Sequence, residues 1–343
     1  TFATDGAALA DLLAVTQNQF VTGKYVENVS NKTTAFDVLQ NRYTELEYAL
    51  AVTSNATNPD YCFRVTNDGT ALDSYSNLPE LSLSFTPTVS TVNFNDGFDV
   101  SLLPGTTTPV YASTSISDLN GFADLSVATT TFFTAAVGAG CTADDNNCYI
   151  TTTADSCSFQ NCSGASCDLV CRADFAFHTD PTDESGGDWF AFVEVEDTAE
   201  NYAFNTSPAI DVFSLRALAV ANNIDYGALT PNSDTGSFNA STTINNIGNN
   251  AIDIEVEGSD LEDGFGSAIP ATKQRFATST FTYTSCTNCQ TLSTTTIPFD
   301  VDLTKPIVSS PPVADEIYWG IEVPFGIPAR PHTGSNIFYA VDD

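Results

Sequence analysis

The sequence contains no methionine, only two histidines and two tryptophans, and few basic residues: 10 lysines and arginines against 43 aspartates and glutamates. The resulting formal net charge of −33 argues against nucleic acid as a partner, because little in the chain can neutralise phosphate. Anionic membrane surfaces are disfavoured for the same reason. No apolar run reaches about 18 residues, so we expect no segment to span a bilayer.

The scarcity of histidine also weakens the enzyme classes. His178 and His332 lie in different parts of the chain, and no Gly-x-Ser-x-Gly motif occurs. Carboxylate pairs for glycoside hydrolysis can be drawn almost anywhere among so many acidic residues, so no pair is informative. His178 stands beside Asp180 and Asp183 in a proline-containing loop, which predicts a solvated surface histidine. We therefore expect no enzymatic activity.

Apolar residues are plentiful despite the acidity. They make up 42% of the chain, with 24 Phe and 12 Tyr, which is enough for sizeable cores and argues against disorder. A length of 343 residues suits two or three domains. Trp189 and Trp319 are candidates for a sugar-stacking face, and Trp319 is also a candidate for the core of the last domain. A chain that begins at Thr1, without an initiator Met or a signal peptide, is expected to be a processed or partial product.

Nine cysteines indicate an oxidising, extracellular compartment. Six of them are separated by 6, 8, 4, 4 and 3 residues, which does not match the paired Cys-x(2–4)-Cys units of zinc sites. Disulfides are the preferred interpretation, with Cys141–Cys148 as one local pair and the remaining connectivity open. Cys286 and Cys289 flank a predicted two-residue hairpin turn and should close each other, which leaves Cys62 as a buried free thiol. The predicted disulfide cysteines are Cys141, Cys148, Cys157, Cys162, Cys167, Cys171, Cys286 and Cys289.

Short stretches of alternating apolar and polar residues, separated by Gly, Asn, Asp and Pro, predict an all-β fold of tandem Ig-like β-sandwiches. One short helix is expected over 6–16, with Asp5 as its N-cap. The stretch from 135 to 168, rich in Thr, Asn, Asp and Gly, is interpreted as a disulfide-stapled insertion between two strand runs, 123–135 and 168–177. The other predicted strands are 46–52, 61–65, 81–85, 190–195, 210–215, 252–256 and 281–283.

Two linkers, Thr86-Pro87-Thr88 and Asn205 to Pro208, predict domain boundaries near residues 86 and 210. The predicted domains are a partial sandwich over 1–86 with a short N-terminal helix or arm, a sandwich over 87–210 with the disulfide-rich insertion, and a C-terminal sandwich over 211–343. The first domain is short for a complete sandwich. We therefore expect a strand from another chain to complete it.

Four stretches carry a family resemblance: residues 45–83, GAGCTADDNNCY from Gly138, CRADFAFHTDPTDESG from Cys171, and DEIYWGIEVPFG from Asp315. They resemble modules of large secreted surface proteins of uncultured, ultra-small bacteria. The resemblance implies an array of Ig-like domains on the cell exterior and further strands upstream of the first module. It implies no enzymatic role.

Calcium is the most plausible ligand. Asp118, Asn120 and Asp124 place oxygen donors around Gly121, which is the donor type that calcium prefers. Further carboxylates at Asp144, Asp145 and 194–197 add to the acidity. The alternative interpretation is an ordinary turn, because Asp-x-Asn-Gly is common in turns and the full EF-hand spacing is absent.

Six Asn-x-Ser/Thr sequons are candidates for glycosylation, although a composition rich in Thr, Ser and Asn also produces such triplets by chance. They begin at Asn28, Asn31, Asn55, Asn161, Asn205 and Asn239.

Two functions fit these features. The first is an extracellular structural subunit of a filament, pilus-like fibre or coat, which binds copies of itself by strand complementation through the first domain. The second is a monomeric surface adhesin that binds a glycan or a host surface through its loops. The incomplete first domain favours the subunit.

Overall fold

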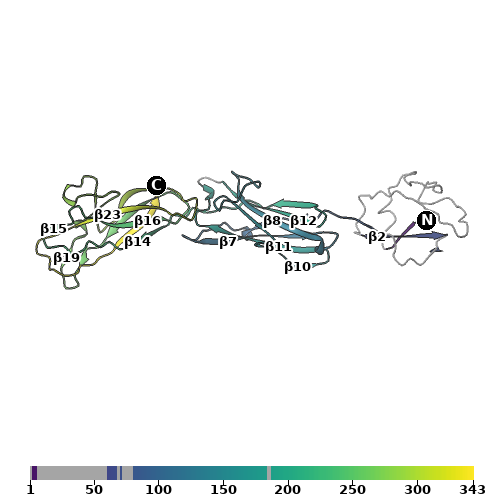
Figure 1. Cartoon of the computed structure of the whole chain (residues 1–343), viewed down its shortest axis with the longest axis horizontal. Helices are drawn as coiled ribbons and strands as arrows, with labels where there is room; N and C mark the ends of the chain where they lie inside the picture. The colour runs from purple at the N-terminus through teal and green to yellow at the C-terminus, as the bar shows by residue number, and fades with distance from the viewer. Residues whose placement is uncertain (1, 6–59, 68–69, 72–79, 184–186) are drawn as a thin grey trace.

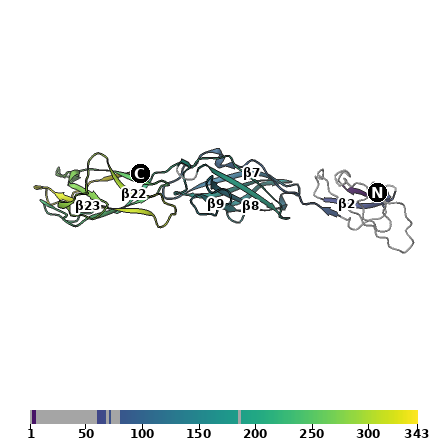
Figure 2. The same cartoon turned by 90° about the horizontal axis from the view of Figure 1, so that it is seen from above.

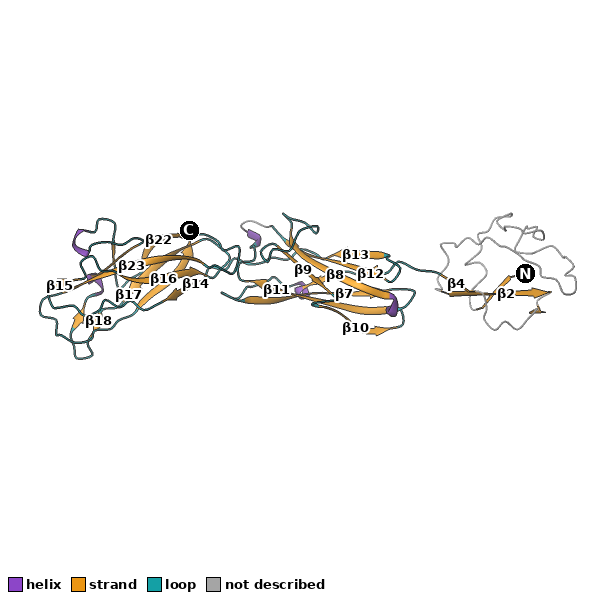
Figure 3. Cartoon of the chain, in the orientation of Figure 1, coloured by secondary structure: helices purple, strands orange, loops and turns teal. Residues whose placement is uncertain are grey.

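A computed structural model describes residues 2–5, 60–67, 70–71, 80–183 and 187–343. The fold is all-β, as the alternating pattern predicted: the strands form antiparallel sheets, and the only helical elements among the described residues are short turns (Figure 3). Three groups of strands follow one another along the long axis in two perpendicular views (Figures 1 and 2). The predicted helix over 6–16 and the predicted strand over 46–52 lie outside the described residues.

The first group of strands forms a single antiparallel sheet. Strand β2 pairs with β1 on one side and with β3 and β4 on the other. Its strands are β1 (Phe2–Asp5), β2 (Asp60–Asn67), β3 (Thr70–Ala71) and β4 (Glu80–Ser82). The predicted strand over 61–65 is confirmed by β2, whereas the strand predicted over 81–85 ends at Ser82.

The middle group is a sandwich of two facing sheets. One sheet has the order β10-β11-β7-β5 with β6 also on β7, and the other has the order β13-β12-β8-β9. The short turns η1 (Asn95–Gly97) and η2 (Phe122–Asp124) connect strands at its ends. Its strands are β5 (Thr88–Val89), β6 (Asn93–Phe94), β7 (Thr107–Ser117), β8 (Leu125–Thr134), β9 (Cys148–Thr152), β10 (Cys157–Ser163), β11 (Ser166–Ala176), β12 (Trp189–Asp197) and β13 (Tyr202–Thr206).

The stretch from 135 to 168 is not an insertion, which corrects the sequence-based interpretation. It contains β9 and β10, and each of them is an edge strand of one of the two sheets. Cys148, Cys157 and Tyr149 from these strands are buried, so they contribute to the core directly. The disulfide-bonded Cys148 and Cys157 thereby supply buried apolar positions in a stretch that is otherwise rich in Thr and Asn.

The third group is a second sandwich, built from a larger sheet in the order β14-β16-β23-β20-β21, with β15 on β23, and a facing sheet in the order β22-β17-β24. A small hairpin of β18 and β19 stands apart. The strands are β14 (Leu218–Ala221), β15 (Ser233–Asp234), β16 (Ala240–Asn246), β17 (Ile252–Gly258), β18 (Leu261–Glu262), β19 (Ala268–Ile269), β20 (Gln274–Ala277), β21 (Gln290–Thr291), β22 (Ile297–Leu303), β23 (Val313–Val323) and β24 (Asn336–Asp342).

Two predicted strands of this region are wrong. Tyr283 lies in the short turn η5 (Tyr283–Ser285) and not in a strand over 281–283. The segment 210–215 makes only isolated bridges, Ile210 with Trp189 and Val212 with Val100. The side chains of Ile210 and Val212 are buried in the core of the middle sandwich. The alternation therefore reflects burial, although this segment is not a strand of a sheet.

Each sandwich is centred on a buried tryptophan. Trp189 packs against Phe175 at 4.9 Å between ring centroids, and Trp319 packs against Phe276 at the same distance. Both indole N–H groups are satisfied inside the protein, by the carbonyl oxygen of Asp180 and the hydroxyl of Thr242. The core position expected for Trp319 is confirmed. The sugar-stacking interpretation is wrong for both, because neither indole reaches the surface.

Candidate functional site

Two candidate sites lie at the ends of the middle sandwich. One is where the sandwich meets the preceding residues, and the other is where it meets the following sandwich. We call them the N-terminal junction (residues 83–85, 118–124 and 197–201) and the C-terminal junction (residues 141–148, 176–183, 212–217, 246–250 and 303–309).

The clustered cysteines form three disulfides: Cys141–Cys148, Cys157–Cys171 and Cys162–Cys167. Cys157 and Cys171 are directly opposite each other on β10 and β11, so this bond ties an edge strand to its neighbour inside the core. Each disulfide would restrict the unfolded chain and thereby stabilise the fold by about 2–4 kcal/mol.

The other two disulfides of the cluster close loops at opposite ends of the sandwich. The loop of Cys162–Cys167 contains Gly164, whose carbonyl accepts a hydrogen bond from the backbone N–H of Phe122 at 3.0 Å, and Ala165, whose carbonyl accepts one from Asp118 at 2.8 Å. This loop therefore supports the N-terminal junction. The loop of Cys141–Cys148 supports the C-terminal junction through Asn146.

The fourth disulfide, Cys286–Cys289, lies in the second sandwich. Its turn is not the predicted two-residue hairpin, because η5 precedes it and only the short β21 follows. The structure does not describe the side chain of Cys62 in β2, so the free thiol expected there stays a prediction.

Lys305 is the centre of the C-terminal junction. Its ammonium group lies 2.8 Å from Asp180 Oδ1 and donates hydrogen bonds to Asn146 Oδ1 at 2.7 Å and to the carbonyl oxygen of His178 at 2.9 Å. Asn146 Nδ2 in turn donates to Asp180 Oδ1 at 2.9 Å. Lys305 follows β22 of the second sandwich, whereas its partners belong to the middle one. The network therefore joins the two sandwiches through a largely buried ion pair.

Asn249 adds a second connection at this junction. The fully buried side chain donates to the carbonyl oxygens of Thr179 at 3.0 Å and Phe213 at 3.1 Å, and its Oδ1 accepts from the backbone N–H of Leu215 at 2.5 Å. The adjacent Gly248 lies so close to this segment that a Cβ there would collide with the carbonyl oxygen of Leu215. The turn and the connecting segment thus fit closely, which restricts bending between the sandwiches.

His178 is buried, which corrects its expected surface position. Its Nε2 hydrogen-bonds the hydroxyl of Ser309 at 3.1 Å, and its Nδ1 is buried without a partner. Burial lowers the pKa of His178 below its usual value, and the nearby Lys305 charge lowers it further. The sequence misled because Asp180, which suggested a polar surface loop, is itself buried against Lys305.

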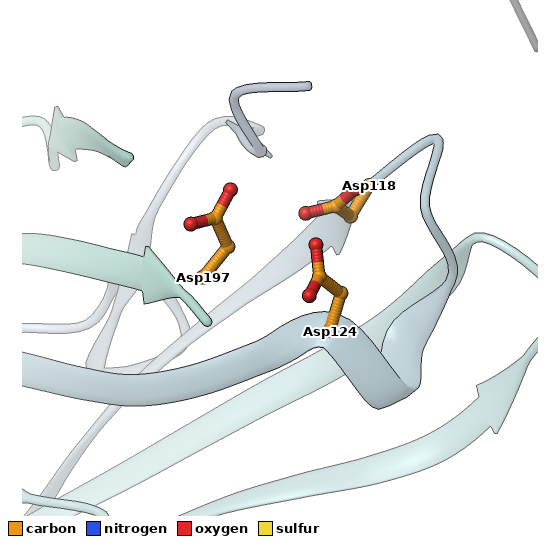
Figure 4. A group of neighbouring side chains, drawn as sticks. All are labelled: Asp118, Asp124 and Asp197. Carbon is orange, nitrogen blue, oxygen red and sulfur yellow. The ribbon is translucent and has the colours of Figure 1, made fainter. Parts of the chain in front are cut away.

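Three aspartates meet at the N-terminal junction. Asp118 follows β7, Asp124 ends η2 and Asp197 ends β12, and one carboxylate oxygen from each lies within 4.8 Å of the others. Figure 4 shows the three carboxylates directed toward a common space. Asp118 and Asp197 are almost completely buried. The calcium ligands predicted from the sequence included Asp118 and Asp124. Asp197 was considered only as part of the additional acidic stretch 194–197.

The hydrogen bonds of these aspartates differ. Asp197 accepts from the backbone N–H groups of Ala199 and Asn201 and from the side chains of Asn201 and Ser84. Burial alone would raise the pKa of Asp197, but these hydrogen bonds together lower it below the usual value. Burial raises the pKa of Asp118, and repulsion from the other two carboxylates adds to the increase.

Asn120, the third predicted calcium ligand, hydrogen-bonds the incoming chain. Its Oδ1 accepts from the backbone N–H of Phe85 at 2.7 Å, and its Nδ2 donates to the carbonyl oxygen of Leu83 at 2.6 Å. The side chain therefore fastens the incoming chain to the sandwich, and its predicted part in calcium binding stays a prediction. Asp144, also considered for calcium, caps its own loop by accepting from the backbone N–H groups of Asn146, Asn147 and Cys148.

Of the six candidate sequons, three lie in the described part of the chain. Asn161 is exposed near the end of β10, and its amide donates to Asp168 at 3.1 Å. The amide of Asn205 donates to the carbonyl oxygen of Ser90 at 3.0 Å, and the amide nitrogen of Asn239 is buried. Asn161 is the most accessible of the three. Asn28, Asn31 and Asn55 lie outside the described residues.

The far end of the second sandwich carries exposed aromatics and an open groove. Phe265, between β18 and β19, is 81% exposed, and Phe325, just beyond β23, is 88% exposed. The groove has a volume of about 1360 Å³ and is bordered by the segments 220–231 and 327–338. Among the described residues, no helix has the length and apolar character to cross a membrane.

No family model matches the sequence, and the search of curated proteins found no match. Among solved structures, the major pilin subunit BcpA of Bacillus cereus is 12% identical, with 66% of this chain and 73% of that chain covered and a TM-score of 0.24. A marsupial T cell receptor is 10% identical, with 74% and 66% covered and a TM-score of 0.22. A protein titled BspA_C_WT is 9% identical, with 74% and 96% covered and a TM-score of 0.20. Scores this low assign the chain to no family and to no function.

Proposed function

We propose that this chain is a non-enzymatic, extracellular structural subunit of a cell-surface filament, pilus-like fibre or coat. The observation that carries the proposal is the C-terminal junction, where Lys305, Asp180 and Asn249 join two sandwiches end to end through buried polar contacts. Buried contacts of this kind oppose separation and bending of the two sandwiches, as a subunit of a fibre requires. The four disulfides fit an oxidising, extracellular location.

Strand complementation through residues 1–86 is the proposed mode of assembly. The described strands β1 to β4 form one sheet, and a facing sheet is not among the described elements of this part of the chain. An unpaired sheet edge gains stability from a strand supplied by a neighbour. The exposed Phe265 and Phe325 at the opposite end provide apolar area for a contact between successive subunits.

The adhesin remains the second candidate because of the same far end. Exposed aromatic rings stack on sugars and on peptide surfaces, and Arg330 lies 4.7 Å from the ring of Phe265. The groove beside them is wide enough for a glycan or a peptide segment. An adhesin would use this end as a monomer, whereas a fibre subunit would bury it against a neighbour.

Electron microscopy of the native material, with size-exclusion chromatography of the recombinant chain, separates the two functions. The subunit predicts fibres or sheets, and a high-resolution map of them in which residues 1–86 are completed by a strand of another chain. A monomer whose residues 1–86 close a sandwich alone would contradict the subunit. In that case glycan-array binding that is lost in Phe265→Ala and Phe325→Ala variants would establish the adhesin.

A further inference from the structure

In the described part of the chain, the acidic group at the N-terminal junction lacks a basic ion-pair partner. Among the described residues, no lysine, arginine or histidine forms an ion pair with Asp118, Asp124 or Asp197. Only 2% of Asp118 and 1% of Asp197 is exposed, so water screens their repulsion poorly. Three carboxylates this close cannot all ionise at low cost without a cation.

Asp118 provides a second and independent observation. Its Oδ1 accepts a hydrogen bond from the backbone N–H of Asn120 at 2.7 Å, but its Oδ2 is buried without any partner. The carboxylate that carries this oxygen is directed toward those of Asp124 and Asp197 (Figure 4). A buried acceptor that is left unpaired costs about 1–3 kcal/mol, and more when it is charged, so native structures rarely keep one. The oxygen is therefore placed as a metal ligand would be.

The type of donor identifies the class of cation. All three ligands are carboxylates, with neither histidine nor cysteine in the group, which suits a hard cation and not zinc or copper. Calcium accepts about six to eight oxygens at about 2.3–2.6 Å in irregular geometry, so that water and the hydroxyl of Ser84 can complete the shell. Magnesium requires a near-ideal octahedron, which carboxylates from two separate segments, 118–124 and the end of β12, are less suited to provide.

We propose that Asp118, Asp124 and Asp197 bind one calcium ion, and that this ion fixes the incoming chain at residues 83–85 to the middle sandwich. The two loops that carry Asp118 and Asp197 also hold that chain. Asn120 bonds the backbone of Leu83 and Phe85, and the hydroxyl of Ser84 lies between Asn201, at 2.7 Å, and Asp197, at 3.4 Å.

Without the ion, repulsion among the carboxylates pushes these loops apart and loosens the incoming chain. With it, both loops are fixed and the first module leaves the sandwich in one direction. Calcium thus does at the N-terminal junction what the ammonium group of Lys305 does at the other. The inference does not depend on the proposed function, because a fibre subunit and an adhesin would both need a defined direction between modules.

Isothermal titration calorimetry of the full chain, first treated with EGTA and then titrated with calcium chloride alone, tests the site. We expect one ion per chain, with a dissociation constant in the range of extracellular modules, about 0.1–1 mM or tighter. The Asp118→Asn variant should bind at least about tenfold more weakly, because it loses a charged ligand. The matched control is Asp300→Asn in the exposed group of Asp253, Asp300 and Asp302, which should leave the affinity unchanged.

Limited proteolysis provides the readout for the junction. Calcium should slow cleavage between residues 82 and 88 severalfold in the wild type and in Asp300→Asn, but not in Asp118→Asn. Asparagine retains the Oδ1 acceptor and removes a repelling charge, so in EGTA this variant should be at least as stable to heat as the wild type. Should it fail to fold, Asp124→Asn is the second variant.

Three results would overturn the proposal. One is the absence of calcium binding by the wild type at several millimolar. Another is an affinity that Asp118→Asn and Asp124→Asn leave unchanged. The third is calcium binding that disappears in Asp300→Asn, since the ion would then belong to the exposed group.

Discussion

Both junctions of the middle sandwich contain buried aspartates, but the two junctions differ in what compensates the negative charge. At the C-terminal junction, buried Asp180 is neutralised by Lys305, which the following sandwich supplies. At the N-terminal junction, three aspartates converge and no basic residue among those described pairs with them. A chain with 10 basic residues against 43 acidic ones can provide its own cation at few places. The cation at the C-terminal junction is part of the chain, whereas the proposed calcium ion would make the N-terminal junction depend on the medium.

Each junction also has a disulfide beside it. Cys141–Cys148 closes the loop that carries Asn146, a partner of Lys305, and Cys162–Cys167 closes the loop that holds the backbone of Asp118 and Phe122. The third disulfide, Cys157–Cys171, lies in the core between them. The cysteine cluster therefore stabilises both ends of the sandwich, and the difference between the junctions lies in the source of the positive charge.

The largest expected effect comes from Lys305→Met. It leaves Asp180 buried without its cation, which costs about 3–5 kcal/mol for a buried pair. Differential scanning calorimetry should show lower stability and a separate transition for each sandwich. The control is Lys273→Met, because the Lys273–Glu322 pair is 35% and 41% exposed at the side chains and should contribute about 0–1 kcal/mol. Equal losses in both variants would contradict the importance of the buried network.

Removal of the two junction disulfides comes second. The double variant Cys141→Ala/Cys148→Ala opens a loop with a sequence separation of 7, and Cys162→Ala/Cys167→Ala opens one with a separation of 5. Loop-closure entropy predicts losses of about 2–2.5 kcal/mol for each, slightly larger for the longer loop.

Denaturant titration measures these losses. The two losses of stability should be similar, but they should affect different parts of the molecule. Cys141→Ala/Cys148→Ala should weaken the coupling between the two sandwiches, and Cys162→Ala/Cys167→Ala should speed proteolytic cleavage at residues 82–88. A pattern in which the two locations are exchanged would contradict the assignment of the loops to their junctions.

Strands were predicted correctly from the sequence where the alternation within one strand reflects burial of one of its faces. The alternation in Trp189–Asp197 and Ile252–Gly258 gave β12 and β17 directly, because every second side chain faces a core. It failed at Ile210 and Val212, which alternate in the same way but make only isolated bridges, to Trp189 of β12 and to Val100 outside the named strands. Periodicity reports that a side chain is buried but not which partner buries it.

The junctions were less predictable because they depend on contacts between distant segments. Asp118 and Asp197 are brought together only when β7 and β12 end at the same edge of the sandwich, which needs the topology of both sheets. Lys305 was missed for the same reason. Its one signal in the sequence is that a basic residue is rare in this chain, so each of the few has a high chance of compensating a specific acid.

A third prediction concerns the attachment of the incoming chain. Asn120→Ala removes hydrogen bonds to the backbone of Leu83 and Phe85, and each is expected to contribute about 0.5–1.5 kcal/mol. Hydrogen exchange of residues 83–85 should become faster, while the core of the sandwich stays protected. Calcium binding should persist, because Asn120 is not one of the three carboxylates. A variant that loses calcium as well would show that Asn120 is a ligand after all.

The smallest expected effect is the response of the C-terminal junction to pH, which depends on His178. Burial lowers its pKa below the usual value of 6.5, and Lys305 lowers it further, although Asp180, Asp144 and Asp145 act in the opposite direction. Between the two pKa values the unfolded chain binds the proton more readily than the folded protein does. The contribution to stability is therefore complete above about pH 6.5 and decreases as the pH falls toward the folded-state pKa.

Thermal melts from pH 7.5 to about pH 5 should show this decrease in the wild type and a flatter profile in a His178→Gln variant. Identical profiles would mean that His178 keeps its ordinary pKa in the folded protein and that the junction responds to acid only through its carboxylates.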